Sequence, residues 1–273
     1  MNKRIPISNE KQKAQNSWRA TDYARFATCL EYGLTNYVTT LPIVAQQQVL
    51  DVACGAGNLS LQVAWLGAIV TGIDFNPDAL DVARTRAAEA KLAIQFDEGD
   101  IEQMKYPSNT FDWGISIFGI MFAIHADLAA QELIRVCKSN GNIAITSWTS
   151  ESLVGQLAQL LARYRPASPG TARTSNWGDE HHVRKYLEWQ TRDLQVSRRL
   201  WRFKFPYGPS GVVDFFRQYS SSHKQVFDLL PEADATTLHQ DLEQVWHNAN
   251  LATDGTTIAD AEYLDVRAVV HKK

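Results

Sequence analysis

Two aspartates and two glycines stand at spacings that suit the binding of a nucleoside. Asp51 lies within a short apolar run, and Gly55 and Gly57 follow it in the segment "VLDVACGAGNLSL", residues 49–61. Asp74 ends the next apolar run, 17 positions beyond Gly57. Glycines at a turn between a strand and a helix let a ligand approach the backbone, where the helix N-terminus exposes unpaired N–H groups. A carboxylate after the second strand can accept two hydrogen bonds from a ribose diol, so this spacing predicts a nucleoside-containing ligand.

A nicotinamide dinucleotide is one such ligand, but two details oppose it. The third glycine of a dinucleotide-binding turn would fall at Ser60, which is not a glycine. Asp51 would also lie beside the pyrophosphate, which its charge would repel. A ligand with an ammonium and a sulfonium would instead be attracted. An NAD(P)-dependent oxidoreductase therefore remains an alternative that the residues disfavour.

The elements that would position these residues alternate along residues 48–148. Apolar, β-branched runs predict strands, and stretches with helical spacing separate them. The predicted strands are 49–52, 69–73, 94–96, 111–118 and 142–148, and the predicted helices are 59–66, 77–91 and 127–138. Strands that alternate with helices indicate an α/β fold, with a doubly wound, mostly parallel sheet covered on both faces.

The second half of the chain continues the same domain. Helical spacing at 150–164 and 234–249 and alternation at 194–205 and 261–271 predict two more helices and two more strands. Residues 171–190 show no assignable pattern. Because no repeat or linker separates the parts, we expect one domain over 1–273, with a helical lid in 1–47, a ligand-binding core in 48–148, and acceptor-side helices with the last strands in 149–273.

Three segments resemble the motifs of one large family. "VLDVACGAGNLSL" resembles motif I of the class I S-adenosylmethionine (SAM) dependent methyltransferases, and "VTGIDFNPDAL" is similar to their acidic second-strand motif. "FDEGDIEQMKYPSNTFDWGISIFGIMF", residues 96–122, resembles their third- and fourth-strand region. Within the family the chain looks most like the small-molecule branch that includes the ubiquinone and menaquinone C-methyltransferases. The resemblance implies a seven-stranded sheet whose antiparallel last strand is "AEYLDVRAVVH", with SAM as cofactor and S-adenosylhomocysteine as product.

The resemblance also implies roles for individual residues around SAM. Asp51, Ala53, Cys54, Gly55 and Gly57 would line the methionine moiety, and Tyr23 of the lid would close over its carboxylate. Asp74 would hold the ribose hydroxyls and Phe75 would lie against the adenine. Asp100 would accept from the adenine amino group and Ile101 would cover the ring, while Ser116, Ile117 and Phe118 would lie below the sulfonium. Ordinary core packing is the alternative for Phe75, Ile101 and Phe118, and a turn aspartate is the alternative for Asp100.

Methyl transfer from a sulfonium needs positioning and water exclusion, and it needs a base only when the acceptor must lose a proton. His125 follows the fourth predicted strand and is the candidate base, with a surface or helix-capping histidine as the alternative. The region after Trp148 is rich in aromatic residues, which suits a flat or apolar small-molecule acceptor, although core packing also explains such rings. A protein that binds SAM without catalysis is a further alternative.

Composition limits the other classes of function. A net charge of -3 gives no broad basic surface for nucleic acid, and Ser116-Ile117-Phe118-Gly119 departs from the motif of adenine methyltransferases. The apolar segment 115–124 is too short to span a membrane, and the first residues lack the apolar stretch of a signal peptide. Cys29, Cys54 and Cys137 stand far apart, so we expect reduced thiols, no metal site and a cytoplasmic protein. The oligomeric state stays open.

Overall fold

A computed structural model describes residues 9–19, 21–164 and 176–272. Its described residues form a seven-stranded sheet in the order β3-β2-β1-β4-β5-β7-β6. The strands are β1 Gln48–Val52, β2 Ile69–Asp74, β3 Gln95–Glu98, β4 Phe111–Ile117, β5 Cys137–Trp148, β6 Thr191–Phe205 and β7 Thr257–Val270. Strands β1 to β5 pair in parallel, whereas β7 runs antiparallel to both β5 and β6. The predicted α/β class and the reversed last strand are confirmed.

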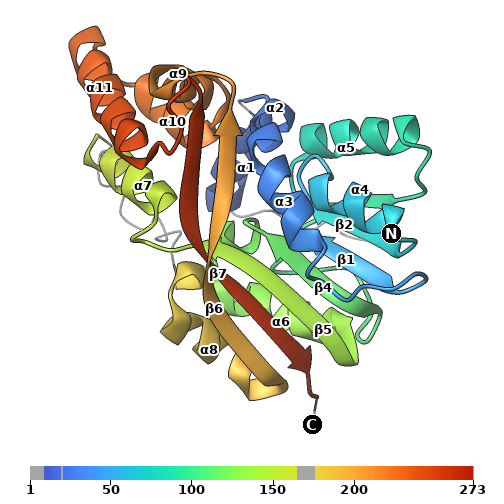
Figure 1. The fold of residues 1–273 in the computed structure, drawn as a ribbon. Coiled ribbons are helices and arrows are strands. Elements are labelled where there is room, and N and C mark those ends of the chain that lie inside the picture. The colour runs from blue at the N-terminus through green and yellow to red at the C-terminus, as the bar shows by residue number, and fades with distance from the viewer. Residues whose placement is uncertain (1–8, 20, 165–175, 273) are drawn as a thin grey trace.

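Helices cover both faces of this sheet (Figure 1). The helices α3 Glu31–Val38, α4 Asn58–Trp65 and α5 Pro77–Glu89 lie on one face, and α6 Ala126–Val136 and α8 Glu180–Leu187 lie on the other. Helix α5 begins as its residues predict: Asn76 is the N-cap, its side chain accepts from the Asp78 N–H, and Pro77 occupies the first turn. Covering both faces leaves the carboxyl ends of the parallel strands as the place where a ligand can reach the sheet.

A second group of helices lies beyond those carboxyl ends (Figure 1). It contains α7 Leu153–Arg163, α9 Pro209–Tyr219, α10 Ser221–Phe227 and α11 Glu232–Ala249, at the far end of the long β6–β7 hairpin. The N-terminal helices α1 Asn9–Arg19 and α2 Tyr23–Ala27 lie between this group and α5. Short 3-10 turns complete the structure at Thr28–Leu30, Ile120–Phe122, Asn176–Gly178 and Glu188–Gln190. The arrangement places α1 and α2 next to the expected ligand edge.

The structure departs from the sequence-based prediction between β4 and β7. Helix α6 ends at Val136 rather than at 138, and β5 begins at once with Cys137 rather than at 142. The polar residues 138–142 lack a strand pattern, but Cys137 pairs with Phe111 and Asn142 pairs with Trp113 across an irregularity in β4. Tertiary pairing therefore extends the strand where local propensity does not. Helix α8 also forms in the region without an assignable pattern, because Val183 and Leu187 are buried.

The hydrophobic core draws side chains from all along the chain. Leu50, Ile73, Ile115 and Ile145 of the central strands are fully buried, and Trp246 of α11 is buried in the same continuous cluster. The core thus fixes the central strands whose ends carry the candidate site.

Among residues 9–19, 21–164 and 176–272, no helix is both long enough and apolar enough to cross a bilayer.

Candidate functional site

The turn after β1 adopts a backbone that favours glycine. Ala53, Gly55 and Gly57 have φ values of 58°, 52° and 78°, in the left-handed region. A methyl group added at Gly57 would lie 3.1 Å from the Cβ of Ala83. One added at Gly55 would lie 2.5 Å from Cε1 of the Tyr23 ring. Both positions therefore favour glycine, and at Gly55 the absence of a side chain lets the Tyr23 ring lie directly against the backbone.

Asp51 lies beneath this turn with 2% of its surface exposed. Its carboxylate accepts a 2.6 Å hydrogen bond from Ser60 Oγ, at the first turn of α4. Burial raises the pKa of Asp51 to about 7, and the charge of Asp74 adds to this, while the hydrogen bonds from Ser60 oppose it. A cation placed next to Asp51 would stabilise its charged form.

Asp74 ties the end of β2 to the glycine turn. One carboxylate oxygen accepts from the Gly55 N–H at 2.8 Å, and the other accepts from the Asn76 N–H at 2.8 Å. Burial raises its pKa, although hydrogen bonds from the backbone of Asn76, Gly55 and Phe75 lower it. The predicted carboxylates at the ends of β1 and β2 are therefore brought to one edge of the sheet with the glycine turn between them.

The third predicted carboxylate, Asp100, follows β3 at the same edge. Its oxygens bind Lys11 Nζ at 2.5 Å and the Glu102 N–H at 2.9 Å. Glu102 in turn accepts the N–H groups of Ile124 and His125 at 2.6 and 2.9 Å, at the start of α6. Glu102 was not predicted, and its spacing two residues after Asp100 gave no signal of this capping contact.

His125 is the N-cap residue of α6, but its side chain makes no capping hydrogen bond and the residue is exposed. The carboxylate of Glu102 satisfies the helix start instead. His125 does not line the cavity beside the glycine turn. Its role as a base stays a prediction, and the structure favours the surface alternative over the capping one.

The predicted residues at the end of β4 and just after it are held in different ways. Ser116 is fully buried, donating to the Val52 carbonyl at 2.8 Å and accepting from the Ile120 N–H at 2.9 Å. Phe118 has a φ of 53°, and its ring stacks on Trp148 with centroids 3.6 Å apart. Ser116 therefore supports the loop rather than facing a ligand, and the strained backbone at Phe118 is held by packing.

A small cavity of about 30 Å³ lies between this turn and helices α2 and α3. Of the predicted residues, Tyr23, Asp51, Ala53, Cys54 and Ile117 line it, whereas Asp74, Phe75, Asp100 and Ile101 lie outside it along the sheet edge. Sequence reasoning missed the rest of the lining: Ala27, Leu30, Leu34, Ala56, Asn58 and Leu59. The spacing of Leu30 and Leu34 fits one face of a helix, a signal that could have pointed to them.

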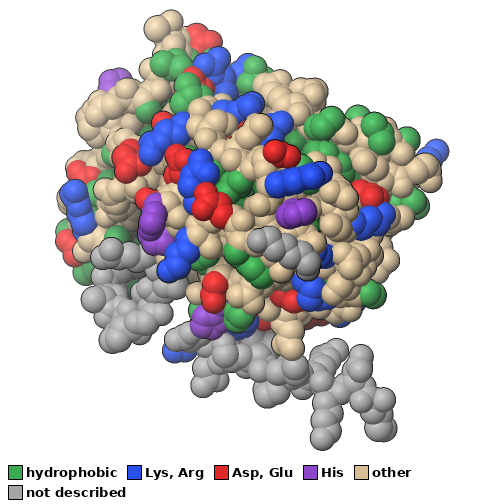
Figure 2. Space-filling view, turned by 90° about the horizontal axis from the view of Figure 1, so that it is seen from below, with side chains coloured by type: hydrophobic (Ala, Val, Ile, Leu, Met, Phe, Trp, Pro, Cys, Tyr) green, Lys and Arg blue, Asp and Glu red, His purple; other side chains and the backbone are tan. Residues whose placement is uncertain are grey.

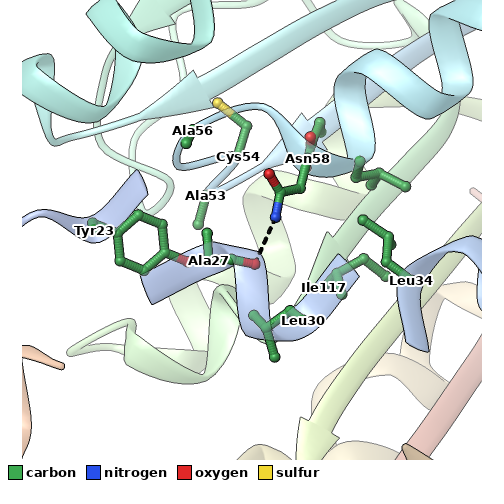
Figure 3. A pocket seen from close by; sticks show the side chains of 11 residues that line it. Tyr23, Ala27, Leu30, Leu34, Ala53, Cys54, Ala56, Asn58 and Ile117 are labelled. Atoms are coloured by element: carbon green, nitrogen blue, oxygen red, sulfur yellow. Dashed lines mark hydrogen bonds between the residues drawn. The ribbon is translucent and has the colours of Figure 1, made fainter. Parts of the chain in front are cut away.

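Figure 3 shows how the two sides of this cavity meet. Tyr23, Ala27 and Leu30 approach from the N-terminal helices, and the side chain of Cys54 points away from them. The Asn58 amide donates to the Ala27 carbonyl at 2.9 Å and so joins α4 to the end of α2. Burial raises the pKa of Tyr23 well above its ordinary value, so its hydroxyl keeps its proton at neutral pH.

Comparison with known proteins agrees with this geometry. The family model of the methyltransferase domain matches residues 43–193. An uncharacterized protein of Mycobacterium tuberculosis is 32% identical over 218 residues, which are 80% of this chain and 79% of the relative. The ubiquinone/menaquinone biosynthesis C-methyltransferase UbiE of Rhodopseudomonas palustris is 34% identical over 113 residues, covering 40% of this chain and 45% of that protein.

A solved structure is similar over most of the chain. The YcgJ protein of Bacillus subtilis superposes with a TM-score of 0.62 at 16% sequence identity, covering 89% of this chain and 99% of that one. At this identity the likeness shows the fold. Together with the domain match, the strand order and the glycine turn between two carboxylates, it confirms the predicted resemblance: the chain belongs to the methyltransferase domain family and has the class I SAM-dependent methyltransferase fold.

Proposed function

We propose that the protein is a SAM-dependent methyltransferase that acts on a small apolar or aromatic acceptor. The observation that carries the proposal is the placement of Asp51 and Asp74 on either side of the glycine turn, at the carboxyl ends of β1 and β2. SAM carries an ammonium and a sulfonium, so it suits a crevice with buried carboxylates. Gly55 has no side chain, so such a ligand would approach its backbone closely once the Tyr23 ring moves away.

Different residues at this edge of the sheet would bind different parts of SAM. Asp51 would attract the ammonium, and the turn of Ala53, Cys54, Gly55 and Gly57 would support the methionine chain, with Tyr23 above it. Asp74 would accept from the ribose hydroxyls. Phe75 and Ile101 are half-buried beside Asp100, where they would enclose the adenine. Ile117 would lie near the sulfonium, since it reaches the cavity from the end of β4.

When bound, SAM supplies an electrophilic methyl group. The protein then has to bind and orient SAM and the acceptor and to exclude water, because the transfer is a direct displacement. The apolar lining of Leu30, Leu34 and Ile117 beside Asp51 supports the exclusion of water. An acceptor that loses no proton needs no base. Transfer to such an acceptor would therefore not depend on His125, which is exposed.

The acceptor side carries aromatic rings. Trp148, Trp177, Trp201, Phe203, Phe205 and Phe216 are buried and pack the core. Phe215 is half-buried, however, and its ring lies 6.3 Å from that of Phe26 on α2. Phe26 in turn contacts Tyr23 at 6.0 Å. These partly open rings next to the glycine turn support a flat or apolar acceptor.

The face of the molecule in Figure 2 supports a small molecule rather than a nucleic acid as the acceptor. In the view of Figure 2, cationic and anionic side chains alternate over the face, and neither sign forms a continuous patch. A nucleic-acid surface would gather Lys and Arg on one face. The proposal of a small-molecule acceptor is therefore consistent with both the rings and the charges.

Binding of SAM measured by isothermal titration calorimetry tests the proposal. We expect binding to the native protein, no binding to Gly55→Asp, and about 10- to 100-fold weaker binding to Asp74→Ala, because a charged hydrogen-bond acceptor is lost. Asp81→Ala, at an exposed position on α5, is the matched control and should bind like the native protein. NADH should give no signal. Absence of heat from SAM with the native protein would refute the proposal.

Turnover needs a separate measurement, because the site specifies binding more directly than catalysis. SAM labelled in its methyl group, mixed with the protein and a metabolite extract, should yield a labelled small molecule and S-adenosylhomocysteine. If the protein binds SAM but labels no acceptor from any extract, it is a SAM-binding protein without catalysis.

A further inference from the structure

Helix α1 lies against the loops that follow β2 and β3, at the sheet edge where the candidate site stands. Lys11 on this helix places its ammonium 2.5 Å from the Asp100 carboxylate and 2.6 Å from that of Glu102. The side chains of Lys11 and Glu102 are 21% and 3% exposed, so solvent screens this ion pair less than a surface pair. One cation therefore joins two carboxylates that belong to the sheet edge.

The same face of α1 is fastened at two further points. The Gln15 amide donates to the Phe75 carbonyl at 2.5 Å, and Arg19 pairs with Asp78 at 2.9 Å. Lys11, Gln15 and Arg19 are spaced by four residues, so they lie on one face of the helix. This face contacts the loop after β3, the loop after β2 and the start of α5, all along the proposed adenosine side of the site.

Another face of α1 contacts the acceptor-side helices. Ser17 Oγ and Ser221 Oγ of α10 lie 2.7 Å apart, and Ser221 Oγ also donates to the Ser17 carbonyl at 2.8 Å. Gln225 of α10 donates to Ser17 as well. Helix α1 thus spans from the cofactor edge to the second group of helices, so a movement of α1 would affect both sides of the crevice.

In this structure α1 and α2 leave little room at the glycine turn, and we call this arrangement the closed position. The Tyr23 ring lies directly against Gly55, and Trp18 contacts both Tyr23 and Phe122, with ring centroids 5.5 and 4.9 Å away. The cavity that remains there is about 30 Å³, whereas small-molecule sites typically measure about 300 Å³ or more. A ligand of the size of SAM therefore reaches the turn only after α1 and α2 move.

We propose that α1 is a gate over the cofactor crevice and that Lys11 is the positioning residue that holds it shut by bridging Asp100 and Glu102. This inference rests on the proposed function, because the gated ligand is SAM and its product. The gate opens when the Lys11 contacts break, and SAM binds only the open form, because the closed form leaves about 30 Å³ at the glycine turn. Lys11 therefore lowers both the association rate and the apparent affinity of the ligand, because it stabilises a form that excludes the ligand.

Glu102 extends the effect of the gate to the loop after β4. Its carboxylate holds Lys11 and the N–H groups of Ile124 and His125 together. Opening of the gate leaves Glu102 bound to the start of α6 only. Closing restores the contact between α1 and the loop that carries Phe122.

Stopped-flow fluorescence with SAM, followed by displacement of bound S-adenosylhomocysteine by excess SAM, tests the gate. We expect Lys11→Met to raise the association rate constant and the apparent affinity by the same factor, about tenfold, with a native dissociation rate constant. Lys11→Arg should retain the native rates, because it keeps a cation between the two carboxylates. Lys13→Met is the matched control, since Lys13 is an exposed lysine on the same helix, and its rates should also be native.

Glu102→Gln provides an independent variant, because its amide carbonyl can still accept from the start of α6 while its charge is lost. It should raise the association rate constant, and the double variant with Lys11→Met should bind SAM no faster than Lys11→Met alone. Ligand-free melting temperatures within a few degrees of native would show that the core is unaffected. A native association rate constant in Lys11→Met, with or without a change in its dissociation rate constant, would overturn the gate.

The two proposals fail in distinguishable ways. If native protein does not bind SAM, the proposed function fails. If native protein binds SAM and Lys11→Met exchanges it at native rates, the gate alone fails.

Discussion

Ser60 donates a 2.6 Å hydrogen bond to the buried carboxylate of Asp51, at the position where a dinucleotide-binding turn has its third glycine. The helix after the glycine turn thereby supports a carboxylate under the site instead of approaching a pyrophosphate closely. Because Asp51 is 2% exposed and its burial raises its pKa to about 7, its charge depends on what binds next to it.

The ligand-free protein should lose stability as pH rises through the titration of Asp51. Its pKa is about 7 in the fold and 3.8 in the unfolded chain, so between these values the folded state holds a proton that the unfolded state has lost. This group's contribution to the free energy of unfolding therefore falls from about pH 4 to about pH 7. Asp51→Asn should flatten this dependence and keep the fold, as thermal melts from pH 5 to pH 8 can show. A variant that melts far below native at all pH values would instead give Asp51 a structural role.

Affinity for SAM should show the opposite dependence on pH. Only ionised Asp51 attracts the ammonium, so we expect binding to strengthen between pH 6 and pH 8 and to release a proton below pH 7. Calorimetry in two buffers of different ionisation enthalpy measures the proton directly. Asp51→Asn should bind more weakly and release no proton from this site. Equal affinity of the native protein at pH 6 and pH 8 would contradict this role.

Gly55→Ala should destabilise the protein through two separate effects. The left-handed backbone at φ 52° costs an alanine about 1–2 kcal/mol, and the added methyl group would lie 2.5 Å from the Tyr23 ring. In a Tyr23→Ala background only the backbone cost should remain. Urea unfolding of the native protein, the two single variants and the double variant gives both parts. An equal cost in both backgrounds would show that Tyr23 does not lie against this glycine.

Loss of the Phe118 ring should destabilise the protein, and glycine should replace Phe118 at a lower cost than alanine. Its ring stacks on Trp148 at 3.6 Å, so Phe118→Ala should lower the free energy of unfolding by about 3–5 kcal/mol. Because its φ is 53°, Phe118→Gly should be less destabilising than Phe118→Ala, the reverse of the usual order. Chemical denaturation of the two variants measures the difference. A glycine variant less stable than the alanine variant would argue against the left-handed backbone.

His125→Ala should leave SAM binding unchanged, since the residue is exposed and lies outside the cavity. Turnover should fall only if the acceptor is a hydroxyl or an acidic carbon that must lose a proton. Methyl-transfer rates of native and variant proteins, measured once an acceptor is identified, decide this point. Native rates with a hydroxyl acceptor would remove His125 from the chemistry.

The sequence predicts most of the central sheet because local patterns and tertiary structure agree there. The apolar runs that contain Asp51 and Asp74 are buried strands, and Asn76 with Pro77 begins a helix as expected. The early start of β5 at Cys137 is different, because pairing with β4 and not local propensity extends it. Helix α8 is short and polar on its exposed side, so its two buried residues give too little periodicity to detect.

The candidate site is predictable to a similar extent. Carboxylates and glycines at strand ends meet because parallel strands end at one edge of the sheet. The contacts of Lys11 with Asp100 and Glu102 join residues about 90 positions apart, and no local spacing encodes them. Ser116 shows the converse case, because its place near the end of β4 suits a ligand contact while its hydroxyl joins β1 to the loop after β4.

A crystal structure of the protein grown with S-adenosylhomocysteine would show whether the cofactor binds at the carboxyl ends of the strands. We expect density for the ligand along the ends of β1, β2 and β3, with its amino group near Asp51 and its ribose hydroxyls on Asp74. An empty crevice at saturating ligand, or ligand bound elsewhere on the protein, would contradict it.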